Sequence, residues 1–233
     1  MPCSGIPEVS MAEMSSTTKK IVAIVLSLCV ILAVIAATGV FYVPGFSEAL
    51  GTNKPRDLGV KADPAKFDAV LSRENVKLNG DVSDFYLGSD VRWSTAVPMD
   101  VTMTNEELSS MMQATNNEKG PLKEVQLKMG DNNLVEMSAQ IDLNEFGYPI
   151  NVPVYTKGTL KKGSGNRIRI DIQEGASGLV PIPENILDQG EMGLEDAVNS
   201  QLAQMPGLKI DTLDISEGQL QFNGAFPQSG TPE

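Results

Sequence analysis

The chain has 233 residues, enough for one domain with a sizeable core or for two small domains. It contains no histidine, which excludes an imidazole base, a Ser-His or Cys-His nucleophile pair and a His-ligated metal. The formal charge of -12 at pH 7 argues against nucleic acid and anionic lipid headgroups as electrostatic partners.

Residues 21–43 give the strongest signal in the chain. From Ile21 to Val43 there is no charged residue, and only Ser27, Thr38 and Gly39 fall outside the apolar set. At about 1.5 Å per residue, a helix of this length reaches roughly 34 Å and crosses a hydrocarbon core of about 30 Å. The run therefore predicts a single transmembrane helix.

Lys19 and Lys20 directly precede this run, and the next basic residue is Lys54. By the positive-inside rule, residues 1–20 are expected to be a cytoplasmic tail and the rest of the chain to lie on the extracytoplasmic side of the cell membrane. A cleaved secretory signal is the alternative, because small residues near the end of the run suit a signal peptidase. Its apolar region is longer than such signals use.

Residues 44–56, rich in Gly, Asn and Pro, are expected to be a linker, followed by a domain at 57–226. Asp63 as N-cap and Pro64 in the first turn predict a short helix with Phe67 and Val70 on one face. The only cysteines, Cys3 and Cys29, lie outside this domain, so no disulfide is expected within it.

A brief strand is expected at 97–103, and a capping box from Thr104 to Glu107 then begins a helix. Two hairpins follow, because apolar and polar residues alternate along their arms. Their arms are 124–129 with 134–143, and 152–160 with 168–172.

Pro181-Ile182-Pro183 leads into a second long helix, whose clearest apolar spacing runs from Leu194 to Met205. A third hairpin is expected from 208–215 and 220–222, and residues 227–233 are expected to be a disordered tail. The predicted fold is α+β, with a curved antiparallel sheet wrapped around helices.

Several of these segments carry a family pattern. The run from Gly178 to Pro183, the helix after it and the stretch from Met205 to Leu220 resemble small bacterial, membrane-anchored tubular lipid-binding (TULIP-like) proteins of the LmeA and YpmS kind. The helix entry from Val101 to Leu108 is similar to theirs too. The resemblance covers about residues 98–224 and implies a half-tube fold that is membrane-tethered or exported. It assigns no binding residue to this chain.

The acidic residues do not predict catalysis. Glu106 and Glu107, and likewise Glu195 and Asp196, are neighbours on helices, where adjacent side chains diverge by about 100° and first-turn acids suit the helix dipole. The sequence Asp131-Asn132-Asn133 is expected to be a turn, because it lacks the glycine and glutamate of an EF-hand. We expect no enzyme activity, no cofactor and no metal site.

Apolar residues of the first hairpin and the two helices are expected to line a groove for an acyl chain. Methionine is soft enough to line such a groove, although it also fills ordinary cores. The candidates are Leu108, Met111, Met112, Val125, Leu127, Met129, Val135, Met137, Ala139, Ile141, Val198 and Leu202.

Two functions remain open. One is a membrane-anchored, extracytoplasmic lipid-binding or lipid-transfer protein. The other is a non-catalytic envelope interaction or assembly module with a closed core and no ligand. They differ in whether the inward-facing apolar residues leave the sheet's concavity open or fill it. The sequence indicates the membrane and a lipid as partners, excludes nucleic acid and identifies no protein partner.

Overall fold

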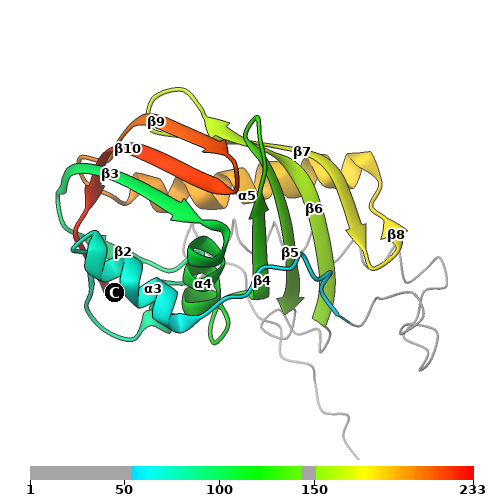
Figure 1. The fold of residues 1–233 in the computed structure, drawn as a ribbon, viewed down its shortest axis with the longest axis horizontal. Coiled ribbons are helices and arrows are strands. Elements are labelled where there is room, and N and C mark those ends of the chain that lie inside the picture. Colours follow the sequence, from blue (N-terminus) through cyan, green and yellow to red (C-terminus); the bar gives the residue numbers. More distant parts are fainter. Residues whose placement is uncertain (1–53, 143–150) are drawn as a thin grey trace, which may run out of the picture.

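The computed structural model describes residues 54–142 and 151–233, which form an α+β fold (Figure 1). The predicted cytoplasmic tail, the transmembrane helix at 21–43 and the linker up to residue 53 lie outside the described residues. Within the described part, no helix combines the length and apolarity needed to cross a membrane.

The described strands form three sheets rather than the single curved sheet expected. In spatial order the first contains β1 (Lys77–Leu78), β11 (Ser229–Pro232) and β2 (Val91–Trp93), and the second β3 (Ala96–Thr104), β10 (Gln219–Pro227) and β9 (Lys209–Ser216). The third contains β4 (Leu122–Met129), β5 (Leu134–Asp142), β6 (Asn151–Lys162), β7 (Ile168–Ser177) and β8 (Val180–Pro181). All pairings are antiparallel except that of β1 with β11.

The break between the second and third sheets has a local cause. The β9 edge meets asparagine side chains from two hairpin turns instead of another strand. Asn133 Oδ1 accepts from Ile215 N at 2.8 Å, and Asn166 Oδ1 accepts from Ile210 N at 3.1 Å. These side chains satisfy the edge donors that a continuous sheet would pair with backbone carbonyls.

Two predicted helix starts are confirmed. α3 (Pro64–Arg73) begins after Asp63, whose side chain accepts from Ala65 N. α4 (Asn105–Asn116) begins after Thr104, and both hydrogen bonds of the capping box with Glu107 are present. A short 3-10 helix, η1 (Val82–Phe85), follows β1 in the chain.

α5 (Glu184–Ala203) begins directly after Pro183, well before the apolar spacing that starts at Leu194. Its first half carries acidic residues and glycines, which hide the helical period. Two acidic residues of α5, Glu191 in its first half and Glu195 in its second, accept hydrogen bonds from β7. α5 runs behind the sheets in Figure 1.

The prediction of a disordered tail at 227–233 is wrong. Pro227 is buried at the end of β10, and Ser229–Pro232 forms β11 between β1 and β2. The polar side chains of this segment do not indicate a strand. The segment is nevertheless ordered, because pairing on both sides satisfies its backbone hydrogen bonds.

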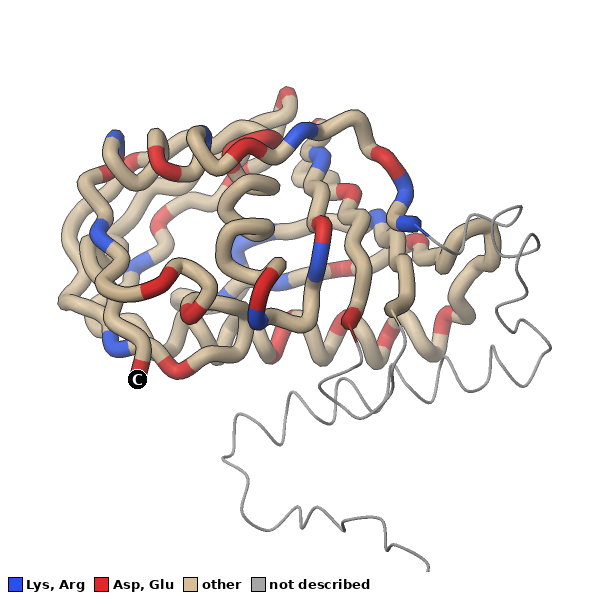
Figure 2. The backbone as a smooth tube through the Cα atoms, turned by 90° about the horizontal axis from the view of Figure 1, so that it is seen from below, with Lys and Arg blue, Asp and Glu red and all other residues tan. Residues whose placement is uncertain are grey.

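Charged residues of both signs are interspersed along the described chain (Figure 2). A core cluster of Val70, Val101 and Met103 lies where α3 meets β3, with Met99 and Phe222 packed against it. Among the described residues, the largest fully buried side chain is Ile215 on β9, 1% exposed.

Candidate functional site

The β4–β5 hairpin carries the predicted row of apolar side chains on one face. Leu127 lies directly opposite Met137, and Met129 lies opposite Val135, so these four residues share a face. Because side chains alternate along a strand, the same face includes Val125, Ala139 and Ile141. We call this the inner face of the five-stranded sheet.

The inner face continues across β6 and β7. Val135 is paired with Gly158, and Gly158 with Ile172, so these residues form one row across the strands. α5 approaches this face at Gly175, where a Cβ atom would lie only 2.3 Å from Leu187 Cδ2. Gly175 therefore permits the close contact between helix and sheet.

The candidate residues on the inner face differ in exposure. Val125 and Ala139 are 0% exposed, and Met129 and Ile141 are also buried. Other apolar side chains on the same face and on α5 are only half-buried: Leu127, Val135, Met137, Ile172, Val198 and Leu202. Apolar surface thus remains accessible on both the sheet and the helix.

The candidates on α4 do not all belong to this face. Leu108 and Met111 pack against Val70, Val101 and Met103, in the cluster beneath the second sheet. Met112 is half-buried on the same helix. The structure therefore divides the predicted groove residues between two apolar regions.

One edge of the five-stranded sheet is closed by a polar stripe on α4 that the sequence analysis missed. Four side chains at i, i+4 spacing bond the free backbone groups of β4, much as a neighbouring strand would. Asn105 accepts from Met129 N at 2.7 Å, Ser109 from Leu127 N at 2.8 Å and Asn117 from Glu124 N at 2.8 Å, while Gln113 donates to Val125 O at 2.9 Å.

On the other side of the sheet, β8 pairs only with the end of β7, and α5 bonds the rest of β7 in the same way. Asn199 accepts from Ile168 N at 2.8 Å and donates to Ile168 O at 2.9 Å. Glu195 accepts from Ile170 N at 3.0 Å, and Glu191 accepts from Ile172 N at 2.7 Å. In the sequence, these edge contacts are indicated only by polar residues that recur every four positions. The same pattern is typical of a helix face exposed to solvent.

The outer face of the sheet is crossed by the first described residues. The Arg56 guanidinium lies 3.7 Å from the centroid of the Tyr155 ring, and Leu58 N donates to Gln126 Oε1 at 2.9 Å. The Tyr155 hydroxyl donates to Glu136 at 2.8 Å. Burial, together with the Glu136 carboxylate, raises the pKa of Tyr155 to about 12. The end of the predicted linker is thus fixed to the domain.

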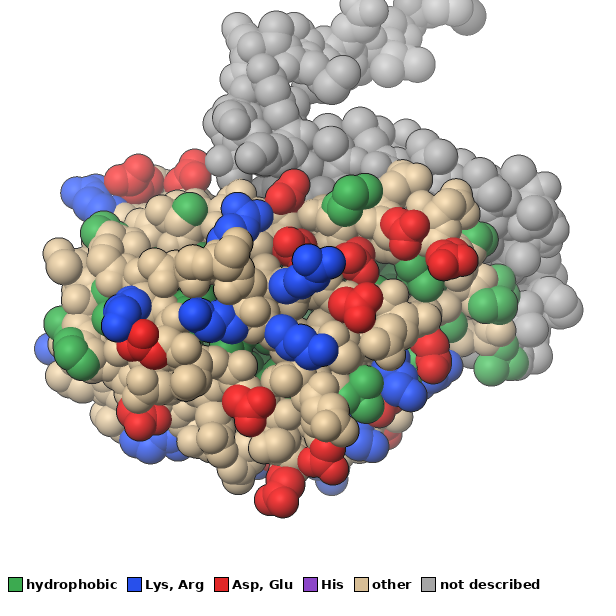
Figure 3. Space-filling model, turned by 90° about the horizontal axis from the view of Figure 1, so that it is seen from above, with side chains coloured by type: hydrophobic (Ala, Val, Ile, Leu, Met, Phe, Trp, Pro, Cys, Tyr) green, Lys and Arg blue, Asp and Glu red, His purple; other side chains and the backbone are tan. Residues whose placement is uncertain are grey.

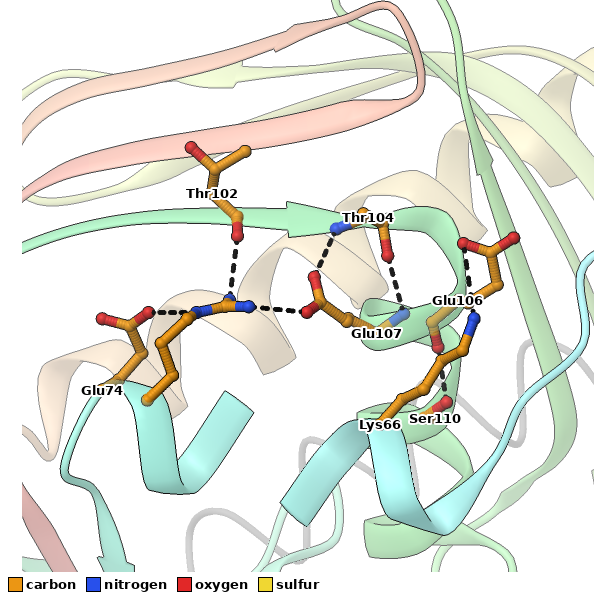
Figure 4. Close-up of polar contacts among 8 residues, drawn as sticks. Lys66, Glu74, Thr102, Thr104, Glu106, Glu107 and Ser110 are labelled. Atoms are coloured by element: carbon orange, nitrogen blue, oxygen red, sulfur yellow. Dashed lines mark hydrogen bonds and ion pairs between the residues drawn. The ribbon is translucent and has the colours of Figure 1, made fainter. Parts of the chain in front are cut away.

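The paired acids of α4 point to different partners (Figure 4). Glu106 lies 4.0 Å from Lys66 Nζ, whereas Glu107 contacts Arg73 at 2.7 Å and caps the helix. Burial raises the pKa of Glu107, but hydrogen bonds from Thr104 and Arg73 outweigh burial and hold it below its ordinary value. These carboxylates have structural partners and do not converge on a common point.

The second acidic pair is divided as well. Glu195 bonds β7, and Asp196 lies 3.9 Å from Arg167 on the β6–β7 hairpin. Among the described residues, no three His, Cys, Asp or Glu side chains are grouped so as to hold a metal ion. No family model and no curated protein matches this chain.

Proposed function

We propose that the protein is a membrane-anchored, extracytoplasmic lipid-binding or lipid-transfer protein that holds an acyl chain between the inner face and α5. The observation that carries the proposal is the half-buried apolar surface on both elements, at Leu127, Val135, Met137, Val198 and Leu202. By comparison, Val101 and Met103 in the cluster beneath the second sheet are at most 9% exposed.

The energetics of an acyl chain fit such a surface. Burial contributes about 0.8 kcal/mol per methylene, so a dozen methylenes provide roughly 10 kcal/mol before ordering costs. Binding on this scale needs no contact with the headgroup. It therefore suits a chain with a formal charge of -12, which disfavours anionic headgroups. We expect weak headgroup selectivity.

The hydrogen bonds along the sheet edges favour binding at the inner face over pairing with a partner strand. Because α4 bonds the β4 edge and α5 bonds the β7 edge, a partner strand has few free backbone groups to pair with there. Assembly by strand addition is therefore disfavoured at these edges.

Native mass spectrometry tests the lipid proposal. Residues 54–233, which include the Arg56 contact, are expected to carry co-purified lipid, and Met137→Trp is expected to lower the lipid-bound fraction at least several-fold. A wild-type domain free of lipid, after expression in a cell whose membranes contain it, contradicts the proposal and favours the envelope assembly module.

The topology has its own test. With residues 1–20 cytoplasmic and residues 21–43 as the anchor, Cys3 is expected to resist an impermeant maleimide in intact cells. Protease added outside is expected to remove the domain. Labelling of Cys3 in intact cells would reverse the proposed orientation.

A further inference from the structure

The turn between β7 and β8 exposes an apolar side chain that the fold does not use. Ser177 pairs with Val180, so Gly178 and Leu179 form a two-residue loop. Gly178 has φ of 59°, as a type II′ turn requires at its first loop position, but that turn sets no apolar requirement at the second. Leu179 is nevertheless 69% exposed.

The surroundings of Leu179 are apolar and uncharged. No charged residue occurs from Gly175 to Pro183. Within this stretch Pro181 and Pro183 are exposed, and Val180 and Ile182 are half-buried. We call residues 178–183 the apolar turn. Hydrophobic side chains gather at the end of the molecule where β8 and the start of α5 lie, on the right in Figure 3.

The first described residues contact the strand pair that leads to this turn. Arg56 stacks on Tyr155, and Tyr155 is paired with Ala176, which precedes Ser177 at the end of β7. At about 3.3 Å per residue along a strand, the apex at Leu179 is roughly 10 Å from Ala176. The first described residues and β8 lie at the same end of the fold (Figure 1).

The apolar turn also adjoins the inner face. A Cβ atom at Gly175 would lie 3.5 Å from Ile182 Cδ1, so a side chain of the turn already contacts the sheet surface that faces α5. A hydrophobic phase that meets the turn therefore also reaches one end of the half-buried apolar surface.

From these contacts we propose that the apolar turn docks into the bilayer that holds residues 21–43, with Leu179 as its leading side chain. This inference rests on the anchoring part of the proposed function. Docking brings one end of the inner face to the membrane, where an acyl chain passes between bilayer and groove without crossing water.

A bilayer fits this surface better than a protein partner does. A stable protein interface buries about 800 Å² on each side, far more than one exposed leucine and two prolines provide. Shallow insertion, about 5–10 Å into the boundary between headgroups and acyl chains, needs only a few apolar side chains. The absence of charge from 175 to 183 means that no ionised group has to lose water.

Tryptophan quenching in vesicles tests the docking. The full chain carrying Leu179→Trp is reconstituted into phosphatidylcholine vesicles with brominated or ordinary acyl chains. The signal of Trp93, the only native tryptophan, is measured in the unsubstituted chain and subtracted. The matched control is Met192→Trp, at a site on α5 that is 61% exposed and lies between Asp188 and Asp196 on the same helix face.

We expect brominated chains to quench the tryptophan at 179 by about half, with a blue-shifted emission, and to leave the tryptophan at 192 unchanged. If the chain floats with the vesicles while both tryptophans stay unquenched, anchoring holds and docking is overturned. If both are quenched equally, the domain lies flat on the membrane and the apolar turn has no special role. If the chain does not float with vesicles, the anchor and the docking both fail.

Discussion

The part of the chain that the structure describes contains two apolar regions with differently buried side chains. Under the second sheet, Val70, Val101 and Met103 are buried to 9% exposure or less, because α3 and α4 both lie against β3 and its neighbours. On the inner face of the five-stranded sheet, Leu127, Val135 and Met137 are only half-buried. The contrast concerns these three side chains and not the whole inner face, because Val125 and Ala139 on the same face are 0% exposed.

The two helices beside the five-stranded sheet form hydrogen bonds with its outer strands. α4 uses a polar stripe to bond β4, and α5 does the same to β7 and also contacts the inner face at Gly175. The same helix α5 therefore both bonds the β7 edge and packs on the inner face.

We expect the largest difference in stability when a methionine side chain is truncated in each of the two regions. Met103→Ala removes a buried side chain and is expected to lower the free energy of unfolding by about 2–5 kcal/mol. Met137→Ala is expected to cost less than half as much, because Met137 is already partly exposed in the native state. Urea unfolding of residues 54–233 measures both. Equal losses would show that the inner face is packed as tightly as the closed cluster.

Replacing a methionine by the larger tryptophan also tests whether the two regions differ in packing. Met103→Trp is expected to cost about 1–3 kcal/mol through overpacking, whereas Met137→Trp and Met112→Trp are expected to cost less than about 1 kcal/mol. Thermal melting of the three variants gives the comparison. If the Met112 and Met137 variants both unfold, the core is closed, and the envelope assembly module should replace the lipid-binding proposal.

The polar edges are expected to matter for stability but not for the lipid. Asn199, 6% exposed, pairs both backbone groups of Ile168, and Asn199→Ala is expected to cost about 1–3 kcal/mol by leaving them unsatisfied. Asn117→Ala, which removes one exposed contact, is expected to cost about 1 kcal/mol or less. Chemical unfolding ranks the two, and the reverse order would contradict the edge role of α5.

The smallest expected effect concerns the outer face at alkaline pH. The pKa of Tyr155 is raised from 10.0 to about 12 in the folded protein, so folding favours the protonated phenol. The resulting stabilisation is fully present below pH 10 and is lost as pH rises toward 12. The melting temperature of the wild type is expected to fall more steeply across this range than that of Tyr155→Phe. Parallel pH profiles would show that Tyr155 makes no such contribution.

Local signals in the sequence predicted much of this fold. The caps at Asp63 and Thr104 and the hairpin around Asp131-Asn132-Asn133 are confirmed, because short-range hydrogen bonds and strand alternation determine them. The row of apolar residues on the first hairpin is also found on one face.

What the sequence did not reveal depends on contacts between distant segments. In the sequence, a solvent-exposed helix face is indicated by Asn105, Ser109 and Gln113. Only the folded structure shows that they bond the backbone of β4. Helical spacing does not determine which of two apolar surfaces a helix face contacts, and the structure packs Leu108 and Met111 against Val70, Val101 and Met103. The polar segment at 229–232 gave no strand signal because both of its partners lie far away in the chain.

The position of β11 has a consequence for biosynthesis. β1 and β2 do not pair with each other, because β11 lies between them and joins Asn79 to Thr231 across 152 residues. On a ribosome that delivers the amino terminus first, this small sheet cannot assemble until almost the last described residue has emerged. The strands at 77–78 and 91–93 must therefore wait unpaired during elongation, and a chain that stalls before Ser229 leaves both of them open to misassembly or proteolysis.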